Sequence, residues 1–261
     1  MAAAAQDGHL LRIEQVSVRF GGVRALDAVT CHVDAGEICG LIGPNGAGKT
    51  TLFNCITRLY AVASGAIAFD GTRIDGLASR RIISLGIART FQNLGIYADM
   101  TVLENVLLGA HHSDGGRFFE TLARPWTSDG RERRMTEWCR SVLRELDLDT
   151  VADVRAGNLP YGTLKRVEIA RALAARPKLL LLDEPAAGLN HGERIEFARL
   201  ITRIRDLFGL TVLLVEHNMG LVMGLCSRIV VLHLGQVLAE GPPAAITANP
   251  AVITAYLGEA A

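Results

Sequence analysis

Hydrophobic and polar residues alternate through the first part of the chain. Apolar side chains recur at about every second position from Leu11 to Phe20 and from Leu26 to Val33, with Gly21-Gly22 between the two stretches. This period is typical of strands with one buried face, and the glycines suit a hairpin turn. The pattern over 10–42, with the apolar segment 38–42 at its end, predicts a small antiparallel sheet that leads into a glycine-rich loop.

The second half of the chain carries continuous apolar runs separated by helical patterns. Residues 178–182 and 210–215 are apolar runs, as expected of central strands covered on both faces. Helical spacing over 164–176 stops before Pro177, and a further helix is expected over 191–208. Alternating strands and helices predict an α/β fold with a mainly parallel sheet.

Helical periodicity without strands sets the middle of the chain apart. Apolar residues at helical spacing over 102–108 and 138–146 predict helices, with a polar Gly/Arg/Asp-rich interval between them. That interval is either a solvated loop or a partner surface. The expected domains are a core at 10–93 and 166–240 that includes the antiparallel β subdomain, a helical subdomain at 94–165 and a C-terminal tail at 241–261.

A glycine-rich loop directly after segment 38–42 has the spacing of a phosphate-binding loop. Glycines let successive N–H groups turn towards a phosphate. The helix that starts near Lys49 and is expected to continue to Tyr60 adds its positive end. In this pattern Lys49 reaches the β- and γ-phosphates and the Thr50 hydroxyl binds Mg²⁺. The expected phosphate-binding residues are Gly43, Asn45, Gly46, Ala47, Gly48, Lys49, Thr50 and Thr51. The loop predicts a P-loop NTPase core.

Four polar side chains follow the ends of other expected strands: Gln92, Asp183, Glu184 and His217. Ligands of open α/β sheets collect outside the carboxyl ends of the parallel strands. Asp183 is suited to hold Mg²⁺, and Glu184 to polarise the attacking water. Gln92 can serve the metal and that water, while neutral His217 can donate to the γ-phosphate. Together they predict nucleotide hydrolysis.

Two further features suggest parts of a nucleotide site. Phe20 ends an expected strand, where it either packs in the core or offers a face to an adenine ring. The turn Pro160-Tyr161-Gly162, at the start of a helix, resembles a second anion-binding end, although the helical insertion separates it from the phosphate loop. Two chains arranged head-to-tail resolve this separation, because each turn then completes the site of the other chain.

Composition narrows the class of protein. Lys and Arg balance Asp and Glu at 27 each, which gives no basis for non-specific nucleic-acid binding. No apolar run approaches the length of a membrane span, and residues 1–6 lack the basic and apolar regions of a signal peptide, so we expect a cytoplasmic protein. The five scattered cysteines are expected to be buried, reduced thiols.

This order of motifs resembles the ATP-binding cassette of ABC transporters over about 10–258. The resemblance implies ATP and Mg²⁺ as cofactors and assigns the motifs as follows: aromatic A-loop Phe20, phosphate loop 43–51, Q-loop Gln92, signature 159–163 with Pro160, Tyr161 and Gly162, Walker B Asp183, catalytic Glu184, D-loop 187–190 and switch His217. More narrowly, the chain is similar to the longer ATPase subunit of branched-chain amino-acid importers in these stretches: 89–93, 112–137, 159–162, 185–190, 216–219 and 255–258. Two positions depart from the general pattern: Pro160 stands where a serine is usual and Asn190 where an aspartate is usual.

The family implies a set of partners and a location. These are integral-membrane permease subunits, a second ATPase protomer that is the same chain or a shorter paralogue, and indirectly a periplasmic or extracellular solute-binding protein. The chain is then peripheral at the cytoplasmic face of the plasma membrane. Related importers carry amides, urea or aromatic products, so the cargo stays open. The alternatives are a soluble cassette ATPase without a transport role and the cassette of a lipid exporter.

Overall fold

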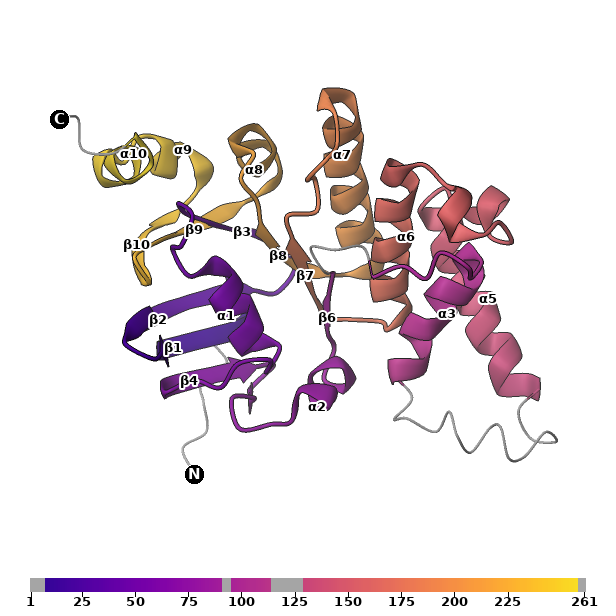
Figure 1. Ribbon diagram of the computed structural model, residues 1–261, viewed down its shortest axis with the longest axis horizontal. Helices are drawn as coiled ribbons and strands as arrows, with labels where there is room; N and C mark the ends of the chain where they lie inside the picture. Colours follow the sequence, from indigo (N-terminus) through magenta and orange to yellow (C-terminus); the bar gives the residue numbers. More distant parts are fainter. Residues whose placement is uncertain (1–7, 91–94, 114–128, 258–261) are drawn as a thin grey trace.

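The computed structural model describes residues 8–90, 95–113 and 129–257, and it contains two sheets and a helical subdomain (Figure 1). The larger sheet has six strands in the order β10-β9-β3-β8-β7-β6, with every neighbouring pair parallel except β9 and β10. Its strands are β3 (Ile38–Ile42), β6 (Ile87–Arg89), β7 (Leu179–Asp183), β8 (Thr211–Val215), β9 (Arg228–His233) and β10 (Gln236–Gly241). The α/β fold with a mainly parallel sheet is therefore confirmed.

The smaller sheet is antiparallel, in the order β2-β1-β4-β5. It consists of β1 (His9–Phe20), β2 (Val23–Asp34), β4 (Ser64–Phe69) and β5 (Thr72–Arg73). β4 and β5 are joined by Asp70 and Gly71, both with positive φ, as a two-residue hairpin turn requires. The sequence pattern over 10–42 suggests one continuous sheet, but β3 leaves it and joins the parallel sheet between β8 and β9.

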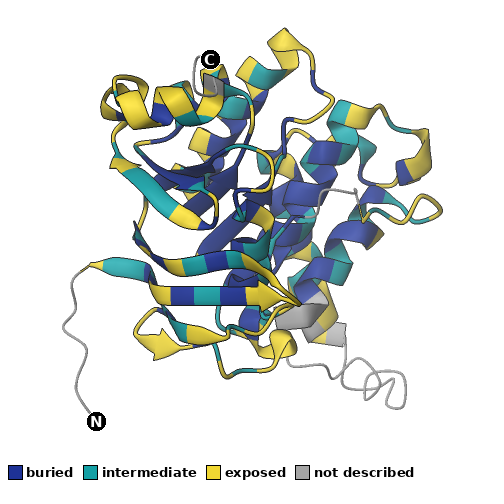
Figure 2. Cartoon of the chain, turned by 60° about the vertical axis from the view of Figure 1, so that its left-hand side comes forward, coloured by how far each residue is buried: buried dark blue, intermediate teal, exposed yellow. Residues whose placement is uncertain are grey.

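Alternate residues of the central strands enter two separate cores. Leu180 and Leu182 of β7 pack in a cluster with residues of α6 and α7, whereas Leu179 and Leu181 pack with α1 and the antiparallel sheet. This is the two-residue period of a strand that is buried on both faces. Figure 2 shows the resulting buried interior between exposed outer helices and loops.

Helices cover both faces of the large sheet and form a separate bundle at one end (Figure 1). Those of the core and tail are α1 (Lys49–Ile56), α2 (Ser79–Ser84), α7 (His191–Phe208), α8 (Met219–Leu225), α9 (Pro243–Thr247) and α10 (Pro250–Leu257). The bundle consists of α3 (Val102–Ser113), α5 (Asp129–Glu145) and α6 (Tyr161–Ala174). Among the described residues, no helix combines the length and apolar character that a bilayer crossing needs.

The helical bundle is joined to the core through α6, which runs on towards β7. Trp138 of α5 donates from its indole to the carbonyl of Ala174 at 3.1 Å, and its ring meets Phe208 of α7 edge-on at 5.9 Å. These contacts fix α5 against the last turn of α6 and against the end of α7. The expected boundary between the helical subdomain (94–165) and the second part of the core (166–240) falls inside α6, because this helix is continuous through position 165.

Candidate nucleotide-binding and catalytic site

The phosphate loop joins the carboxyl end of β3 to the N-terminus of α1. Two of its glycines have positive φ angles and lie against neighbouring backbone: Gly43 (φ 151°) beside the carbonyl of Leu232, and Gly48 (φ 103°) beside that of Ala25. A β-carbon at these positions would lie 2.1 Å and 2.7 Å from the two carbonyl oxygens, so only glycine fits. The glycine spacing is therefore required by the packing of the loop.

Lys49 lies within the loop that it is expected to serve. The side chain is buried, and Nζ donates to the carbonyl oxygens of Gly43 at 2.7 Å and Pro44 at 2.9 Å. Burial lowers the pKa of Lys49, while the negative charges of Glu184 and Asp183 act in the opposite direction. The phosphate loop and the end of β7, far apart in the sequence, thus share one electrostatic environment.

Asp183, at the end of β7, is buried and paired with an arginine of the neighbouring strand. Its Oδ2 accepts a hydrogen bond from Nη2 of Arg89 at 2.7 Å, and Nη1 of the same arginine donates to Asn54 Oδ1 of α1 at 2.6 Å. The other carboxylate oxygen, Oδ1, is buried without a hydrogen-bond partner among the described residues. A buried carboxylate oxygen with an unused lone pair, in a site that also contains the exposed hydroxyl of Thr50, is a donor set that fits a hard divalent cation.

Glu184 and His217 form a pair where β7 and β8 end. Glu184 has φ 48°, an uncommon backbone conformation for a residue other than glycine, and its N–H donates to the carbonyl of Val215 at 2.9 Å. Nε2 of His217 donates to Glu184 Oε1 at 2.9 Å. The two side chains are 26% and 44% exposed, so the pair is open to solvent. Left-handed backbone of this kind is concentrated at functional sites.

Glu216 connects two loops of the candidate site, a position that the sequence alone does not reveal. Its carboxylate is buried; Oε1 accepts the N–H of Ala186 at 2.8 Å and Oε2 accepts that of His217 at 3.0 Å. It therefore joins the loop that follows Glu184 to the loop that carries His217. The sequence feature that could have pointed to Glu216 is its place directly after an apolar strand, because a carboxylate buried there needs hydrogen-bond partners.

Phe20 and Tyr60 form an exposed aromatic pair. Phe20, the last residue of β1, is 46% exposed, which excludes the core-packing alternative. Its ring meets that of Tyr60 edge-on, with centroids 5.0 Å apart. The sequence did not indicate that Tyr60 lies beside Phe20. Tyr60 follows the end of α1, and no local pattern shows which aromatic rings meet in the fold. The pair offers the aromatic surface that adenine stacking requires.

The signature turn begins α6, with Pro160 as its N-cap and Tyr161 exposed. Tyr161 lies against the D-loop, since a β-carbon on Gly188 would come within 3.0 Å of its ring. Figure 1 shows α6 and α1 on opposite sides of β7 and β8. Within one chain, therefore, Pro160, Tyr161 and Gly162 do not share the site formed by the phosphate loop.

Asn190 acts as a helix cap in this structure. Its Oδ1 accepts the N–H of Glu193 at 3.0 Å, and the Glu193 carboxylate accepts the N–H of Asn190 at 2.8 Å. This reciprocal arrangement is a capping box at the start of α7. The amide therefore has a structural role that does not need the negative charge of an aspartate.

Gln92 lies outside the described residues, so the structure does not describe its expected contacts. The segment after it is anchored to α3 by Asn105, which is fully buried. Asn105 Oδ1 accepts the N–H of Tyr97 at 2.9 Å, while Nδ2 donates to the carbonyls of Tyr97 at 3.0 Å and Thr101 at 2.9 Å. These bonds hold the exposed Tyr97 side chain at the boundary between core and helical bundle.

Comparisons with known proteins agree with this fold. A family model described as "ABC transporter" matches residues 26–187, and one described as "Branched-chain amino acid ATP-binding cassette transporter" matches residues 236–261. The chain is 43% identical to the high-affinity branched-chain amino acid transport ATP-binding protein BraF of Pseudomonas aeruginosa and 41% identical to LivG of Escherichia coli, each over 96% of this chain and 98% of the relative. A solved ATP-binding cassette of an ABC transporter in its ADP conformation matches with a TM-score of 0.84 and 33% identity, covering 96% of this chain and 99% of that one.

The two sheets, the inserted helical bundle and the phosphate loop define an ATP-binding P-loop ATPase. The chain belongs to the ATP-binding proteins of ABC transporters, in the family whose curated members include BraF and LivG. The resemblance noted in the sequence is confirmed at this level.

Proposed function

We propose that this chain is the ATP-hydrolysing subunit of an importer for branched-chain or related amino acids, acting at the cytoplasmic face of the plasma membrane. The names of its relatives and the family match over the C-terminal residues 236–261 support this cargo class. Integral-membrane permease subunits are then the direct partners, and a periplasmic or extracellular solute-binding protein an indirect one.

The observation that carries hydrolysis is the pairing of Glu184 with His217 at 2.9 Å beside the phosphate loop. In our proposal the Glu184 carboxylate orients and polarises the attacking water, and His217 hydrogen-bonds the γ-phosphate. Lys49, which now donates to two loop carbonyls, turns to the β- and γ-phosphates when ATP binds. Each of these groups already lies at the site in the chain alone, which favours an ATPase over a passive nucleotide-binding module.

Magnesium binding belongs to the same proposal. Thr50, Asp183 and Gln92 would hold the ion, and the unpartnered Oδ1 of Asp183 supports this assignment. Mg²⁺, when bound, neutralises charge on the β- and γ-phosphate oxygens. Arg89 donates a hydrogen bond to the other oxygen, Oδ2, and so orients the Asp183 carboxylate with Oδ1 free for the ion.

A complete site requires a second cassette, the same chain or a shorter paralogue. The separation of α6 from α1 within one chain supports a head-to-tail pair in which each signature turn meets the phosphate loop opposite. Pro160 has no N–H to donate, so contacts of the signature to the γ-phosphate come from backbone groups such as the N–H of Gly162. Closure of the pair then transmits force to the permease through the boundary near Gln92 and Tyr97.

Reconstitution of the complete importer in liposomes tests this proposal. The chain, its permease subunits and any shorter paralogue are assembled with ATP inside, and the solute-binding protein is added outside. Uptake of radiolabelled leucine, isoleucine and valine is then measured against a urea and an aromatic amino-acid control. We expect ATP-dependent uptake of the branched-chain amino acids that Glu184→Gln abolishes. ATP hydrolysis without uptake of any of the three would retain the ATPase and overturn the cargo.

A further inference from the structure

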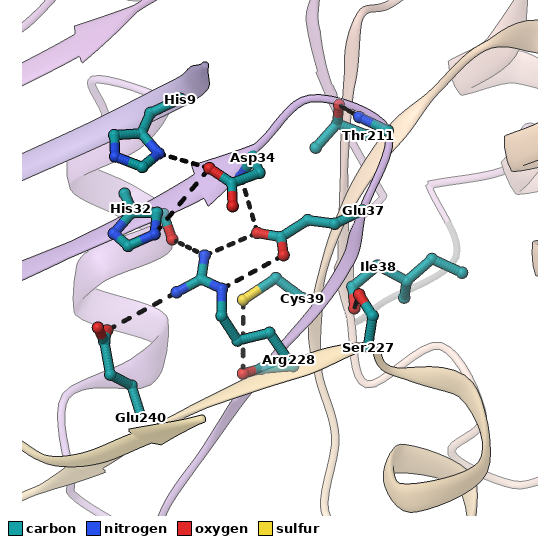
Figure 3. A network of polar contacts seen from close by, with 12 residues as sticks. His9, His32, Asp34, Glu37, Ile38, Cys39, Thr211, Ser227, Arg228 and Glu240 are labelled. Carbon is teal, nitrogen blue, oxygen red and sulfur yellow. Dashed lines mark hydrogen bonds and ion pairs between the residues drawn. The ribbon is translucent and has the colours of Figure 1, made fainter. Parts of the chain in front are cut away.

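A second cluster of ionisable side chains lies on the antiparallel sheet (Figure 3). His9 begins β1 and pairs in the ladder with Asp34 of β2, and His32 precedes Asp34 by two residues on the same face. The chain continues from Asp34 through Glu37 to the start of β3, so the cluster lies near the amino ends of the parallel strands. The nucleotide site lies at their carboxyl ends, and the two sites are therefore distinct.

The geometry of the cluster suits a metal ion. One ligand atom from each of His9, His32 and Asp34 lies within 4.8 Å of the other two. His9 Nδ1 hydrogen-bonds Asp34 Oδ1, and His32 Nε2 lies 4.0 Å from the same oxygen. Ligands of a tetrahedral zinc ion are about 3.3–3.6 Å apart at bond lengths of about 2.0–2.2 Å. The His9–Asp34 separation is shorter than this range and the His32–Asp34 separation is longer. Small side-chain rotations therefore bring the three ligand atoms to bonding distance of one ion.

The surroundings favour a cation despite a nearby arginine. The Arg228 guanidinium donates to the His32 carbonyl and to Glu37 Oε1, the latter at 2.7 Å, and its Nη1 lies 3.7 Å from Glu240. Two carboxylates therefore contact the one guanidinium, and with Asp34 beside them the local charge is negative.

The three candidate ligands are partly open to solvent. The His9 and His32 rings lie close together, with centroids 3.9 Å apart and planes tilted by 37°. Arg12, opposite His32 in the ladder, has its guanidinium 3.9 Å from the Glu14 carboxylate. The side chains of the three candidate ligands are 27%, 30% and 44% exposed, which allows access from solvent and a water as fourth ligand.

We propose that His9, His32 and Asp34 bind one divalent transition-metal ion of the zinc type, with water completing the coordination. Neutral imidazole nitrogens and a carboxylate oxygen are ligands that Zn²⁺ accepts in a tetrahedral site. The ion joins β1 to β2, and Glu37, which accepts the N–H of Asp34 at 2.7 Å, connects the site to β3. Binding therefore stabilises the junction of the two sheets and takes no part in the ATPase chemistry.

The test uses the full chain without a polyhistidine tag, free of nucleotide and in millimolar Mg²⁺. Zinc binding is measured by equilibrium dialysis, and coordination by the visible spectrum of the Co²⁺ form. We expect one zinc per chain and a rise in Tm of about 5–10 °C at about 100 times Kd, reversed by chelation. The Co²⁺ spectrum should show tetrahedral bands without the thiolate charge-transfer band that cysteine ligation gives.

Matched variants decide whether these three residues form the site. His32→Asn and Asp34→Asn should each weaken zinc binding more than about 100-fold, because loss of a ligand exceeds the loss of an outer-shell partner. His191→Asn removes an exposed histidine of α7 and should bind zinc like the parent chain. Circular dichroism checks that each variant folds. If either substitution in β2 disturbs folding, His9→Asn in β1 serves as the test of the site. No stoichiometric zinc, or equal affinity in the three ligand variants and the parent, would overturn the proposal.

Discussion

The buried carboxylate of Glu216 accepts a hydrogen bond from the backbone N–H of Ala186 at 2.8 Å. Its second oxygen accepts the N–H of His217 at 3.0 Å. One side chain thus connects the two loops after β7 and β8, and the distance between Glu184 and His217 depends on it. Glu216 touches no nucleotide in our proposal; it positions the residues that do.

Glu216→Gln should lower kcat for ATP hydrolysis by about 10–100-fold, because the amide nitrogen cannot accept one of the two backbone N–H groups and leaves it unsatisfied at a cost of about 1–3 kcal/mol. KM for ATP should change little, since the phosphate loop keeps its contacts. The control is Glu196→Gln, an exposed carboxylate of α7 paired with Arg166 at 3.3 Å. A rise in KM with unchanged kcat would contradict a positioning role.

Glu184→Gln should keep ATP binding and reduce hydrolysis by about 100–10,000-fold, the usual contribution of a general base. Trapped nucleotide should accumulate in a closed pair of cassettes, visible by size-exclusion chromatography with multi-angle light scattering. Lys49→Ala should instead lose nucleotide affinity, measured by fluorescent-nucleotide titration. Parental turnover in Glu184→Gln would remove the carboxylate from its proposed role.

Arg89→Met should destabilise the nucleotide-free chain by about 3–5 kcal/mol, because it leaves a buried carboxylate without its positive partner. The Arg89 and Asp183 side chains are 9% and 1% exposed, so solvent cannot compensate. The double variant Arg89→Met/Asp183→Asn should recover part of this loss, since the uncompensated charge is gone. Urea unfolding of the parent, both single variants and the double variant measures the coupling; additive effects would show that the pair is independent.

The five cysteines should resist alkylation in the native protein. All five are buried and free, as the sequence analysis predicts, and burial raises the pKa of Cys31 and Cys226 from 9.0 to about 12. Between pH 9 and 12 these thiols ionise in the unfolded chain but stay protonated in the folded one. Their contribution to the free energy of unfolding is therefore unchanged below pH 9 and falls as the pH rises towards 12. Iodoacetamide labelling at pH 8, read by mass spectrometry, should modify the cysteines only in denaturant. Rapid native labelling of either residue would contradict their burial.

Several element boundaries could not be read from the sequence. The helix after the phosphate loop was expected to reach Tyr60, yet α1 ends at Ile56, and Arg58 then takes a left-handed conformation (φ 59°). α6 starts at Tyr161 rather than Leu164, since Pro160 has the extended backbone of an N-cap. Periodicity reports which face is buried, whereas the ends of helices depend on caps and contacts formed in the fold.

The order of elements and the chemical types at the strand ends could be predicted from the amino-acid sequence. Glycine spacing, continuous apolar runs and the polar residues after them are local properties, and they predict the phosphate loop, Asp183, Glu184 and His217. Three relationships became visible only in the folded chain: β3 inserts between β8 and β9, Arg89 pairs with Asp183, and Glu216 joins two loops. Those relationships connect residues far apart in the chain, and burial selects partners for charged groups only once the strands have been placed side by side.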